Sequence, residues 1–248
     1  MRSTIVASGR RFNKPNLRGD RMTIIDAMPL LAPHGRIRAA INLGNPLLAW
    51  RLSDGGLDGL SVRIAREIAE ILGVGLRLIA VEHARHSFER LRDGDADVGF
   101  LAIDPLRAEY LAFSDPYVTI HGGFLVPDGS SLQTAEDVDQ ASIRIAASHG
   151  SAYGLHLQRV VTSATIVETA SFEESLTLLR RGEVDVAAGI TEAFPQNATG
   201  AWRTLEGTFL QIRQAVCVRI ERAAAIAFLN DYLSARPTVS NEMHQDKA

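Results

Sequence analysis

Arg107 is the side chain of this sequence best suited to hold a small charged molecule. It lies in the stretch IDPLRAEYLAFSDPY, residues 103–117, a few positions before a polar, aromatic turn that contains a proline. A guanidinium is planar, can hold a carboxylate through two parallel charge-assisted hydrogen bonds, and keeps its charge when water is removed. Two interpretations are open: an anion-binding arginine, or an arginine that pairs weakly at the surface with Asp104 or Glu109.

The other groups that could do chemistry give weaker signals. Cys217 is the only cysteine and lies in the apolar run QAVCVRI, where we expect a buried thiol rather than a nucleophile. The histidines have no metal-motif spacing, and we expect them to be solvated or locally hydrogen-bonded: His83, His86, His121, His149 and His156. Of these, His149 beside Gly150 could still touch a ligand. We therefore predict no metal, no cofactor and no catalytic residue.

Composition sets the class of protein and excludes several partners. The chain has 248 residues, 46% of them hydrophobic, and a formal net charge of −3, so it can bury a large core and presents no basic face to nucleic acid. No run approaches the roughly 20 apolar residues that cross a bilayer, so we expect no membrane insertion, and we expect a monomer. Residues 1–34 are predicted to be a leader that is partly disordered.

The leader bears on the expected location of the protein. The stretch before Met22 is basic and lacks the apolar core of a secretory signal. As written, the chain is expected to be cytoplasmic. The alternative is a periplasmic protein whose start is misassigned, and the sequence leaves open whether translation begins at Met1 or Met22.

A repeat organises the rest of the chain. LRDGDADV at 91–98 and LRRGEVDV at 179–186 share the pattern Leu-Arg-x-Gly-acid-x-Asp-Val. Each copy is expected to end an amphipathic helix at its glycine and to begin an apolar strand. Chance similarity of short motifs is the alternative, but the order of the flanking elements also agrees.

Helices and strands alternate around both copies. Before the first copy we predict a helix over 60–72 and a strand over 76–81. Before the second we predict strands over 143–148 and 165–170, a helix over 151–161, and a helix that begins at the capping box SFEE. This alternation favours two α/β lobes, each a mostly parallel sheet covered by helices. A ligand would then bind between the lobes, at the carboxyl ends of the strands.

Several of these stretches resemble the periplasmic solute-binding proteins of ABC transporters, in the polar amino-acid binding family, family 3. The resemblance covers about residues 35–235 and depends on GRIRAAINLGN, GLDGLSVRIAREIAEILG, LRDGDADVGFLAIDPLRAEYLAFSDPYV, IRIAASHGSAYGLHL and FEESLTLLRRGEVDVAAGI. It implies the two-lobed type II fold with a two-stranded hinge. Lobe 1 would comprise 35–120 plus 215–248, and lobe 2 would comprise 121–214.

The resemblance also implies a set of ligand-binding residues. Arg107 would hold the α-carboxylate of the ligand, and the opposite wall would come from SHGSAY, where Ser151 begins a helix. Arg213 and Gln214 are polar groups in an apolar strand and need a partner, either a ligand or a hinge hydrogen bond. Phe100 could contact the ligand or pack in the core. The remaining predicted contacts from the two lobes are Asn42, Asn45, His149 and Ala152.

Two positions depart from the family pattern. Five residues after each repeat aspartate lie Ala102 and Ile190, where the family usually has a Ser or Thr and an Asp that pairs with the α-ammonium. A desolvated ammonium without a partner costs several kcal/mol. We therefore expect this site to reject ordinary α-amino acids unless another acid, such as Glu192, replaces the missing one.

The leading hypothesis is a solute-binding protein, not an enzyme, whose lobes close on a small carboxylate, amino-acid-like or an organic acid, and deliver it to an ABC permease. The alternative is a lyase on the same scaffold, similar to the cyclohexadienyl or arogenate dehydratases, with Glu192 or Glu168 as the acid. Against it, AAGITEAF lacks the Thr-Asp-x-x-Glu pattern of those enzymes. A third hypothesis, the effector-binding half of a regulator, is disfavoured because the first 35 residues contain no helix-turn-helix segment.

Overall fold

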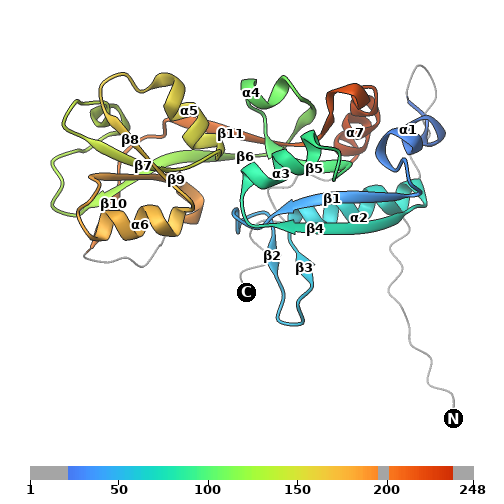
Figure 1. The fold of residues 1–248 in the computed structure, drawn as a ribbon, viewed down its shortest axis with the longest axis horizontal. Coiled ribbons are helices and arrows are strands. Elements are labelled where there is room, and N and C mark those ends of the chain that lie inside the picture. The colour runs from blue at the N-terminus through green and yellow to red at the C-terminus, as the bar shows by residue number, and fades with distance from the viewer. Residues whose placement is uncertain (1–21, 195–200, 237–248) are drawn as a thin grey trace, which may run out of the picture.

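The chain folds into two α/β lobes that are joined by two long strands (Figure 1). This computed structural model describes residues 22–194 and 201–236. Within those residues, one nine-stranded sheet runs through both lobes in the order β4-β1-β5-β11-β6-β9-β7-β8, and β10 pairs with β6. The expected α/β fold with helices on both sides of the sheets is confirmed.

Lobe 1 is built on three parallel strands that carry helices on both faces. The predicted apolar stripe of the helix over 60–72 is buried, and the helix ends at Gly73 with φ +67°, a conformation that favours glycine. A short hairpin projects from this lobe. The elements are β1 (Arg36–Asn42), β4 (Gly75–Val81), β5 (Val98–Ala102), the hairpin strands β2 (Trp50–Arg51) and β3 (Leu57–Asp58), and helices α1 (Ile24–Leu31), α2 (Leu60–Leu72), α3 (Ala84–Arg92), α4 (Pro105–Ala108) and α7 (Ala225–Ser234).

Lobe 2 repeats this plan on a smaller scale. Its parallel strands are covered on one face by α5 and on the other by α6, each over its own apolar cluster. Ser151 and Ser171 cap the two helices, as the sequence predicts. The elements are β7 (Arg144–Ser148), β8 (Thr165–Thr169), β9 (Val186–Ile190), β10 (Trp202–Thr204), α5 (Ala152–Val160), α6 (Phe172–Arg180) and the short 3₁₀ helices Ala135–Val138 and Thr191–Ala193.

Two antiparallel strands connect the lobes. β6 (Leu111–Pro127) and β11 (Leu210–Arg219) pair along their length, from Leu111↔Arg219 in lobe 1 to Gly122↔Leu210 in lobe 2. β11 also pairs with β5 of lobe 1, whereas β6 also pairs with β9 of lobe 2. The predicted lobe boundaries, at 120/121 and 214/215, fall inside these strands, and the second coincides with a shift in register between Gln214 and Ala215. The division itself stays a prediction.

The sequence repeat corresponds to a repeated ion pair. In lobe 1, the Arg38 guanidinium donates from Nε and Nη2 to the two oxygens of Asp97, at 2.9 and 2.8 Å, and Arg38 N–H also donates to this carboxylate. In lobe 2, Arg144 makes the same three hydrogen bonds to Asp185, at 2.8–2.9 Å. Each pair joins the first strand of a lobe to the loop before its third strand. The repeat therefore has a structural role in both lobes.

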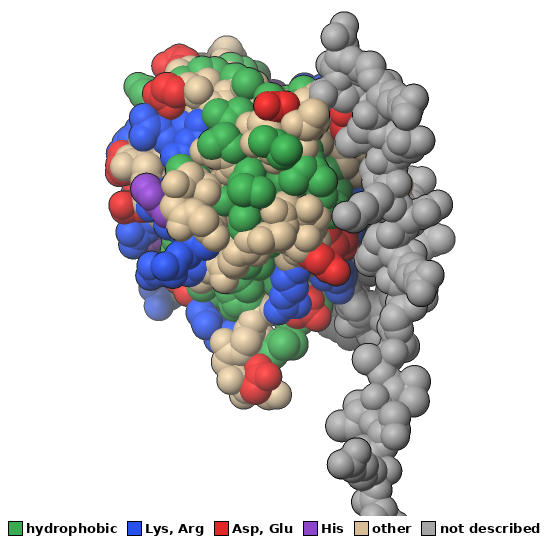
Figure 2. All heavy atoms as spheres, turned by 90° about the vertical axis from the view of Figure 1, so that its right-hand side faces the viewer, with side chains coloured by type: hydrophobic (Ala, Val, Ile, Leu, Met, Phe, Trp, Pro, Cys, Tyr) green, Lys and Arg blue, Asp and Glu red, His purple; other side chains and the backbone are tan. Residues whose placement is uncertain are grey.

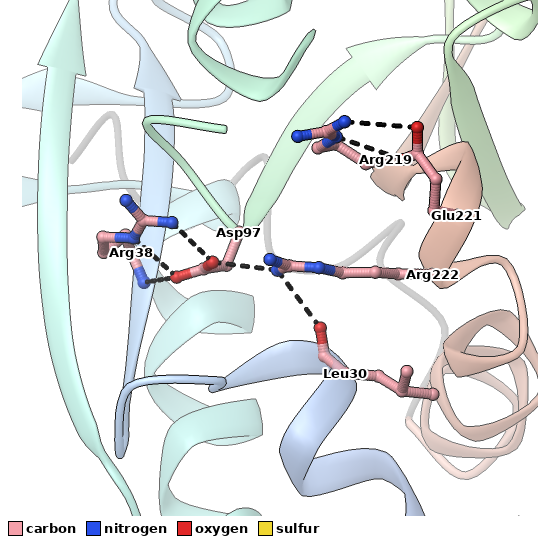
Figure 3. Close-up of polar contacts among 6 residues, drawn as sticks. All are labelled: Leu30, Arg38, Asp97, Arg219, Glu221 and Arg222. Atoms are coloured by element: carbon pink, nitrogen blue, oxygen red, sulfur yellow. Dashed lines mark hydrogen bonds and ion pairs between the residues drawn. The ribbon is translucent and has the colours of Figure 1, made fainter. Parts of the chain in front are cut away.

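Lobe 1 extends its copy of this pair toward the carboxyl end of the chain. Figure 3 shows Asp97 between Arg38 and Arg222, with Arg222 also donating to the carbonyl oxygen of Leu30 in α1. The Asp97 side chain is fully buried, whereas that of Asp185 is 34% exposed. Burial alone would raise the pKa of Asp97, but the hydrogen bonds from Arg38 and Arg222 outweigh it and lower that pKa.

The end of lobe 1 that carries α1 and α7 is partly apolar. Figure 2 looks onto this end and shows hydrophobic side chains in the middle of the face, with charged side chains around them. Ile25 of α1 is the most exposed large hydrophobic residue of the described ranges, at 80%. This face lies at the far end of lobe 1 from lobe 2 (Figure 1).

Candidate functional site

A cavity of about 350 Å³ lies between the lobes, at the carboxyl ends of their parallel strands. The loops after β1 and β4 and the end of β5 with the turn that follows line it from lobe 1. The loops after β7 and β8 and the last residue of β9 line it from lobe 2, and Ile212 and Gln214 of β11 complete the lining. This is where a ligand site in an open α/β sheet is expected. The repeated fold thus places two sets of strand ends around one space.

Nine of the eleven residues that the sequence analysis singled out line this cavity. They come from strand ends, loops and β11, and lie up to 172 positions apart in the sequence, which is the separation between Asn42 and Gln214. Whether each of them binds a ligand stays a prediction. The nine residues are Asn42, Asn45, Ala102, Arg107, His149, Ser151, Ala152, Ile190 and Gln214.

Two of the predicted contacts, Phe100 and Arg213, do not line the cavity. Phe100 lies inside β5 rather than at its end; its side chain is buried in the lobe 1 core, edge-on to Tyr117 at 6.2 Å between ring centroids. Arg213 is exposed, because neighbouring residues of a strand point to opposite faces and it is Gln214 that turns inward. Of the two polar residues in this apolar strand, only Gln214 lines the cavity.

The Arg107 guanidinium is buried at the junction of the lobes. The residue is 3% exposed, and its side chain donates from Nη1 to Ala102 O at 3.1 Å and from Nη2 to Gly150 O of lobe 2 at 2.8 Å. Within the described part of the chain, neither of these partners is a carboxylate, so the predicted alternative of a surface pair with Asp104 or Glu109 does not occur. Burial lowers the pKa of Arg107, and the charge of Asp104 offsets part of that effect.

The turn that carries Arg107 is held in place by Asp104. This carboxylate caps α4, accepting from Leu106 N–H at 3.0 Å, and Pro105 follows at the first helical position, where its missing N–H is not needed. Its other oxygen accepts from Arg159 of lobe 2 at 2.8 Å. No sequence pattern predicts this contact, because Asp104 and Arg159 are 55 positions apart and belong to different lobes.

The lobe 2 wall is formed by the amino-terminal end of α5. The Ser151 hydroxyl accepts from Gly154 N–H at 3.0 Å and donates to Ser148 O at 2.7 Å, so it is the helix cap that the sequence predicted. Tyr153 donates from its hydroxyl to Ser148 Oγ at 2.8 Å. Burial raises the pKa of Tyr153. This wall therefore presents hydroxyls and amides rather than charges.

Ala102 and Ile190 line the cavity as apolar side chains, as expected. The suggestion that Glu192 replaces the missing acid is wrong, because β9 ends at Ile190 and Glu192 belongs to the 3₁₀ helix Thr191–Ala193. Its carboxylate accepts from His121 N–H at 3.0 Å and pairs with His121 Nδ1 at 2.7 Å, and it does not line the cavity. The strand alternation that would have turned it inward does not apply beyond the strand.

Two acids that line the cavity were missed. Glu82 directly follows β4, and Glu173 lies in the first turn of α6, after β8. Both could have been found by applying the strand-end rule to every strand, instead of to the two repeat aspartates alone. Both acids are exposed. Neither is a buried carboxylate beside Arg107.

His149 lines the cavity, and a carboxylate outside the cavity lining hydrogen-bonds to its ring. Its Nδ1 pairs with Glu168 Oε2 at 3.0 Å, and the other oxygen of Glu168 accepts from Gln158 Nε2. Glu168 itself does not line the cavity. Among the residues that the structure describes, no cluster of three or more His, Cys, Asp or Glu side chains is arranged to hold a metal ion. None of the described helices combines the length and apolar character that a membrane crossing requires.

Comparison with known proteins gives matches in sequence. Residues 37–149 match the family model of bacterial extracellular solute-binding proteins, family 3. The ABC transporter glutamine-binding protein GlnH of Bacillus subtilis is 28% identical over 137 residues, which cover 54% of this chain and 50% of the relative. The glutamate-binding protein GluB of Corynebacterium efficiens is 25% identical over 193 residues, which cover 73% of this chain and 65% of the relative. The chain thus spans between half and two thirds of these curated relatives.

Solved structures share the fold at lower identity. The holo arginine-binding protein ArgBP of T. maritima superposes with a TM-score of 0.70 at 22% identity and covers 82% of this chain and 91% of its own. The periplasmic VFT2 domain of Bordetella pertussis BvgS gives a TM-score of 0.72 at 18% identity and covers 90% of this chain and 96% of its own. These matches confirm the two-lobed architecture.

Proposed function

Because the chain belongs with the bacterial extracellular solute-binding proteins of family 3, we propose that it binds a small carboxylate in the cavity between its lobes and releases it unchanged. The lobes would close on the ligand by bending at β6 and β11, since contacts to both lobes favour the closed arrangement. The same residues from both lobes that line the cavity would form the binding site. This proposal keeps the leading hypothesis of the sequence analysis.

The buried guanidinium of Arg107 is the observation that carries the proposal. Among the described residues, its hydrogen-bond partners are two carbonyl oxygens, which are dipoles and do not neutralise its charge. Asp104, whose charge acts on Arg107, is already paired with Arg159, so one carboxylate serves two guanidinium groups. An uncompensated buried charge is costly, and an anion placed beside it recovers part of that cost. A carboxylate fits a planar guanidinium in a bidentate way.

The wall around Arg107 favours an organic acid over an ordinary α-amino acid. Ala102 and Ile190 line the cavity without a charge, and the acids that do line it, Glu82 and Glu173, are exposed. An α-ammonium sits one carbon from its carboxylate and would therefore be desolvated without a partner. The relatives named for glutamine and glutamate carry no further information about the ligand of this chain.

Delivery of the ligand to an ABC permease is part of the proposal. It is supported by the description of the B. subtilis relative as a component of an ABC transporter. The location of the chain stays a prediction: cytoplasmic as written, or periplasmic if translation begins elsewhere. Cell fractionation of the expressed protein, with N-terminal sequencing of the mature chain, would decide between them.

A thermal-shift screen tests the binding proposal. The purified protein is heated with a panel of small carboxylates, their amides and α-amino acids, and a ligand present at 100 times its dissociation constant adds about 2.7 kcal/mol of stability. We expect stabilisation by carboxylates and none by the matching amides. Arg107→Ala is expected to remove the response while the variant stays folded. A carboxylate response that survives in Arg107→Ala would refute the assignment of the anion site.

The lyase alternative has no observation in its favour. The two acids considered for proton transfer lie outside the cavity lining: Glu192 is held by His121, and Glu168 is held by His149 and Gln158. An acid that transfers a proton must come within hydrogen-bond reach of the substrate. Incubation with prephenate or arogenate, followed by a search for aromatic product, remains the direct test.

A further inference from the structure

Two polar contacts between the lobes near the cavity come from one short turn. Asp104 and Arg107, three residues apart on α4 of lobe 1, each make a polar contact with lobe 2: Asp104 with Arg159 of α5 at 2.8 Å, and Arg107 with Gly150 O at 2.8 Å. Both contacts require the lobes to be close together. The turn thus carries an anion-binding candidate and a lobe-to-lobe ion pair side by side.

The Asp104 carboxylate of this ion pair is well shielded from solvent, and the Arg159 guanidinium is partly shielded. The Asp104 side chain is 4% exposed, and that of Arg159 is 34% exposed. Other ion pairs of lobe 2 lie within the lobe and are more exposed, such as Arg181 with Glu183, at 3.8 Å and with side chains that are 65% and 54% exposed. A half-buried charged hydrogen bond stabilises more than an exposed pair does.

Asp104 also acts on the geometry of Arg107. One of its oxygens fixes the first turn of α4 through Leu106 N–H at 3.0 Å, and the other reaches Arg159. If lobe 2 moves away and takes Arg159 with it, Asp104 loses this partner. Asp104 is the residue that caps α4, the turn that carries Arg107. It also takes a positive charge away from Arg107, because Arg159 is close enough to lower the pKa of Arg107 after the larger effects of burial and Asp104.

We propose that the Asp104–Arg159 ion pair is an interlobe latch that holds part of the protein population in the closed arrangement before any ligand binds, and that Asp104 is the positioning residue that links lobe closure to the orientation of Arg107. The latch makes the closed arrangement accessible without a ligand. It works next to the proposed anion site but does not depend on which molecule binds there.

The test uses the distance between the lobes, measured by pulsed electron paramagnetic resonance. Spin labels are placed at two exposed positions, through Glu70→Cys in lobe 1 and Glu136→Cys in lobe 2. The native Cys217 is buried, and burial raises its pKa to about 12, so it should stay unlabelled. The protein is unfolded, dialysed and refolded first, so that no small molecule from the cells remains.

Five variants are compared in this labelled background. Arg159→Gln removes the latch, Asp104→Asn removes its charge but keeps an oxygen that can cap α4, and the double variant tests whether the two act together. Arg181→Gln is the matched control, because it removes an exposed ion pair of the same lobe. Arg159→Lys keeps the charge and is expected to restore most of the wild-type behaviour.

We expect the wild type to show two populations of molecules, one with a short and one with a long distance between the lobes. The ratio of the short-distance to the long-distance population should fall about tenfold in Arg159→Gln and in Asp104→Asn, which is the size expected for the loss of a charged hydrogen bond. The double variant should resemble either single variant, and Arg181→Gln should match the wild type. An absent short distance in the wild type, or an unchanged ratio in Arg159→Gln, would overturn the latch. Neither result affects the thermal response of Arg107→Ala, which tests the binding site separately.

Discussion

The repeated Arg–Asp pair allows one lobe to serve as the control for the other. Asp97→Asn and Asp185→Asn make the same change at equivalent positions of the repeat, but the two carboxylates differ in burial and in partners. Asp97 is fully buried and receives hydrogen bonds from Arg38 and Arg222, whereas Asp185 is 34% exposed and, among the described residues, pairs with Arg144 only. The first change should therefore destabilise the protein more than the second.

The expected size follows from these environments. Removal of one member of a buried ion pair costs about 3–5 kcal/mol, because it leaves the other charges without compensation. The partly exposed pair in lobe 2 is worth about 1 kcal/mol. For a domain of this size, 1 kcal/mol shifts the melting temperature by about 2–4 °C. Asp97→Asn should lower Tm by roughly 6–20 °C and Asp185→Asn by roughly 2–4 °C.

Thermal unfolding followed by circular dichroism at pH 7 measures both shifts, and the pH dependence gives a second check. Hydrogen bonds hold the pKa of Asp97 below its ordinary value in the folded protein, so this carboxylate stabilises the fold above its unfolded pKa of about 4. That contribution is lost as pH falls through the folded pKa. The difference between wild type and Asp97→Asn should shrink in strong acid. Equal losses for the two variants at pH 7 would show that burial and the third partner are not what distinguishes the lobes.

Two further predictions concern the cavity and the cysteine. Ile190→Asp supplies a carboxylate on the cavity wall and should raise the affinity for α-amino acids by about tenfold or more. Calorimetric titration with glutamine and arginine measures this affinity. No gain would mean that the repeat does not place Ile190 where the α-ammonium binds. The Cys217 thiol is buried, and burial raises its pKa to about 12. It should therefore react with a thiol reagent at pH 8 only after the protein unfolds. Rapid reaction of the folded protein would contradict the placement of Cys217 in the core.

Much of the fold could be read from the sequence because local signals and the repeat agree. Gly94 and Gly182 end their helices with positive φ, as the two copies of the repeat require. The strand ends that follow then place Ala102 and Ile190 at the cavity by symmetry. Arg107 was found from the chemistry of its guanidinium and from the family resemblance of the stretch that contains it. The partners of the buried charged side chains, in contrast, could not be predicted from the sequence.

The errors have a common origin in three-dimensional contacts. Phe100 and Ala102 share a strand, but only the position at the strand end reaches the cavity. Glu192 was assigned by strand alternation, yet the chain turns into a 3₁₀ helix at Thr191 and delivers the carboxylate to His121. The partnership of Asp104 with Arg159 depends on how the two lobes meet, and no pattern within either lobe encodes it.

The order of strands in the sheet has a consequence for synthesis on the ribosome. Lobe 2 is assembled largely from an unbroken run of chain, whereas lobe 1 needs β11 to cover the edge of β5 and Arg222 to reach Asp97, and both are made last. A nascent chain that stops before residue 210 can therefore pair the strands of lobe 2, while in lobe 1 the edge of β5 that β11 will cover stays unpaired. The first half to emerge from the exit tunnel is the last to be completed.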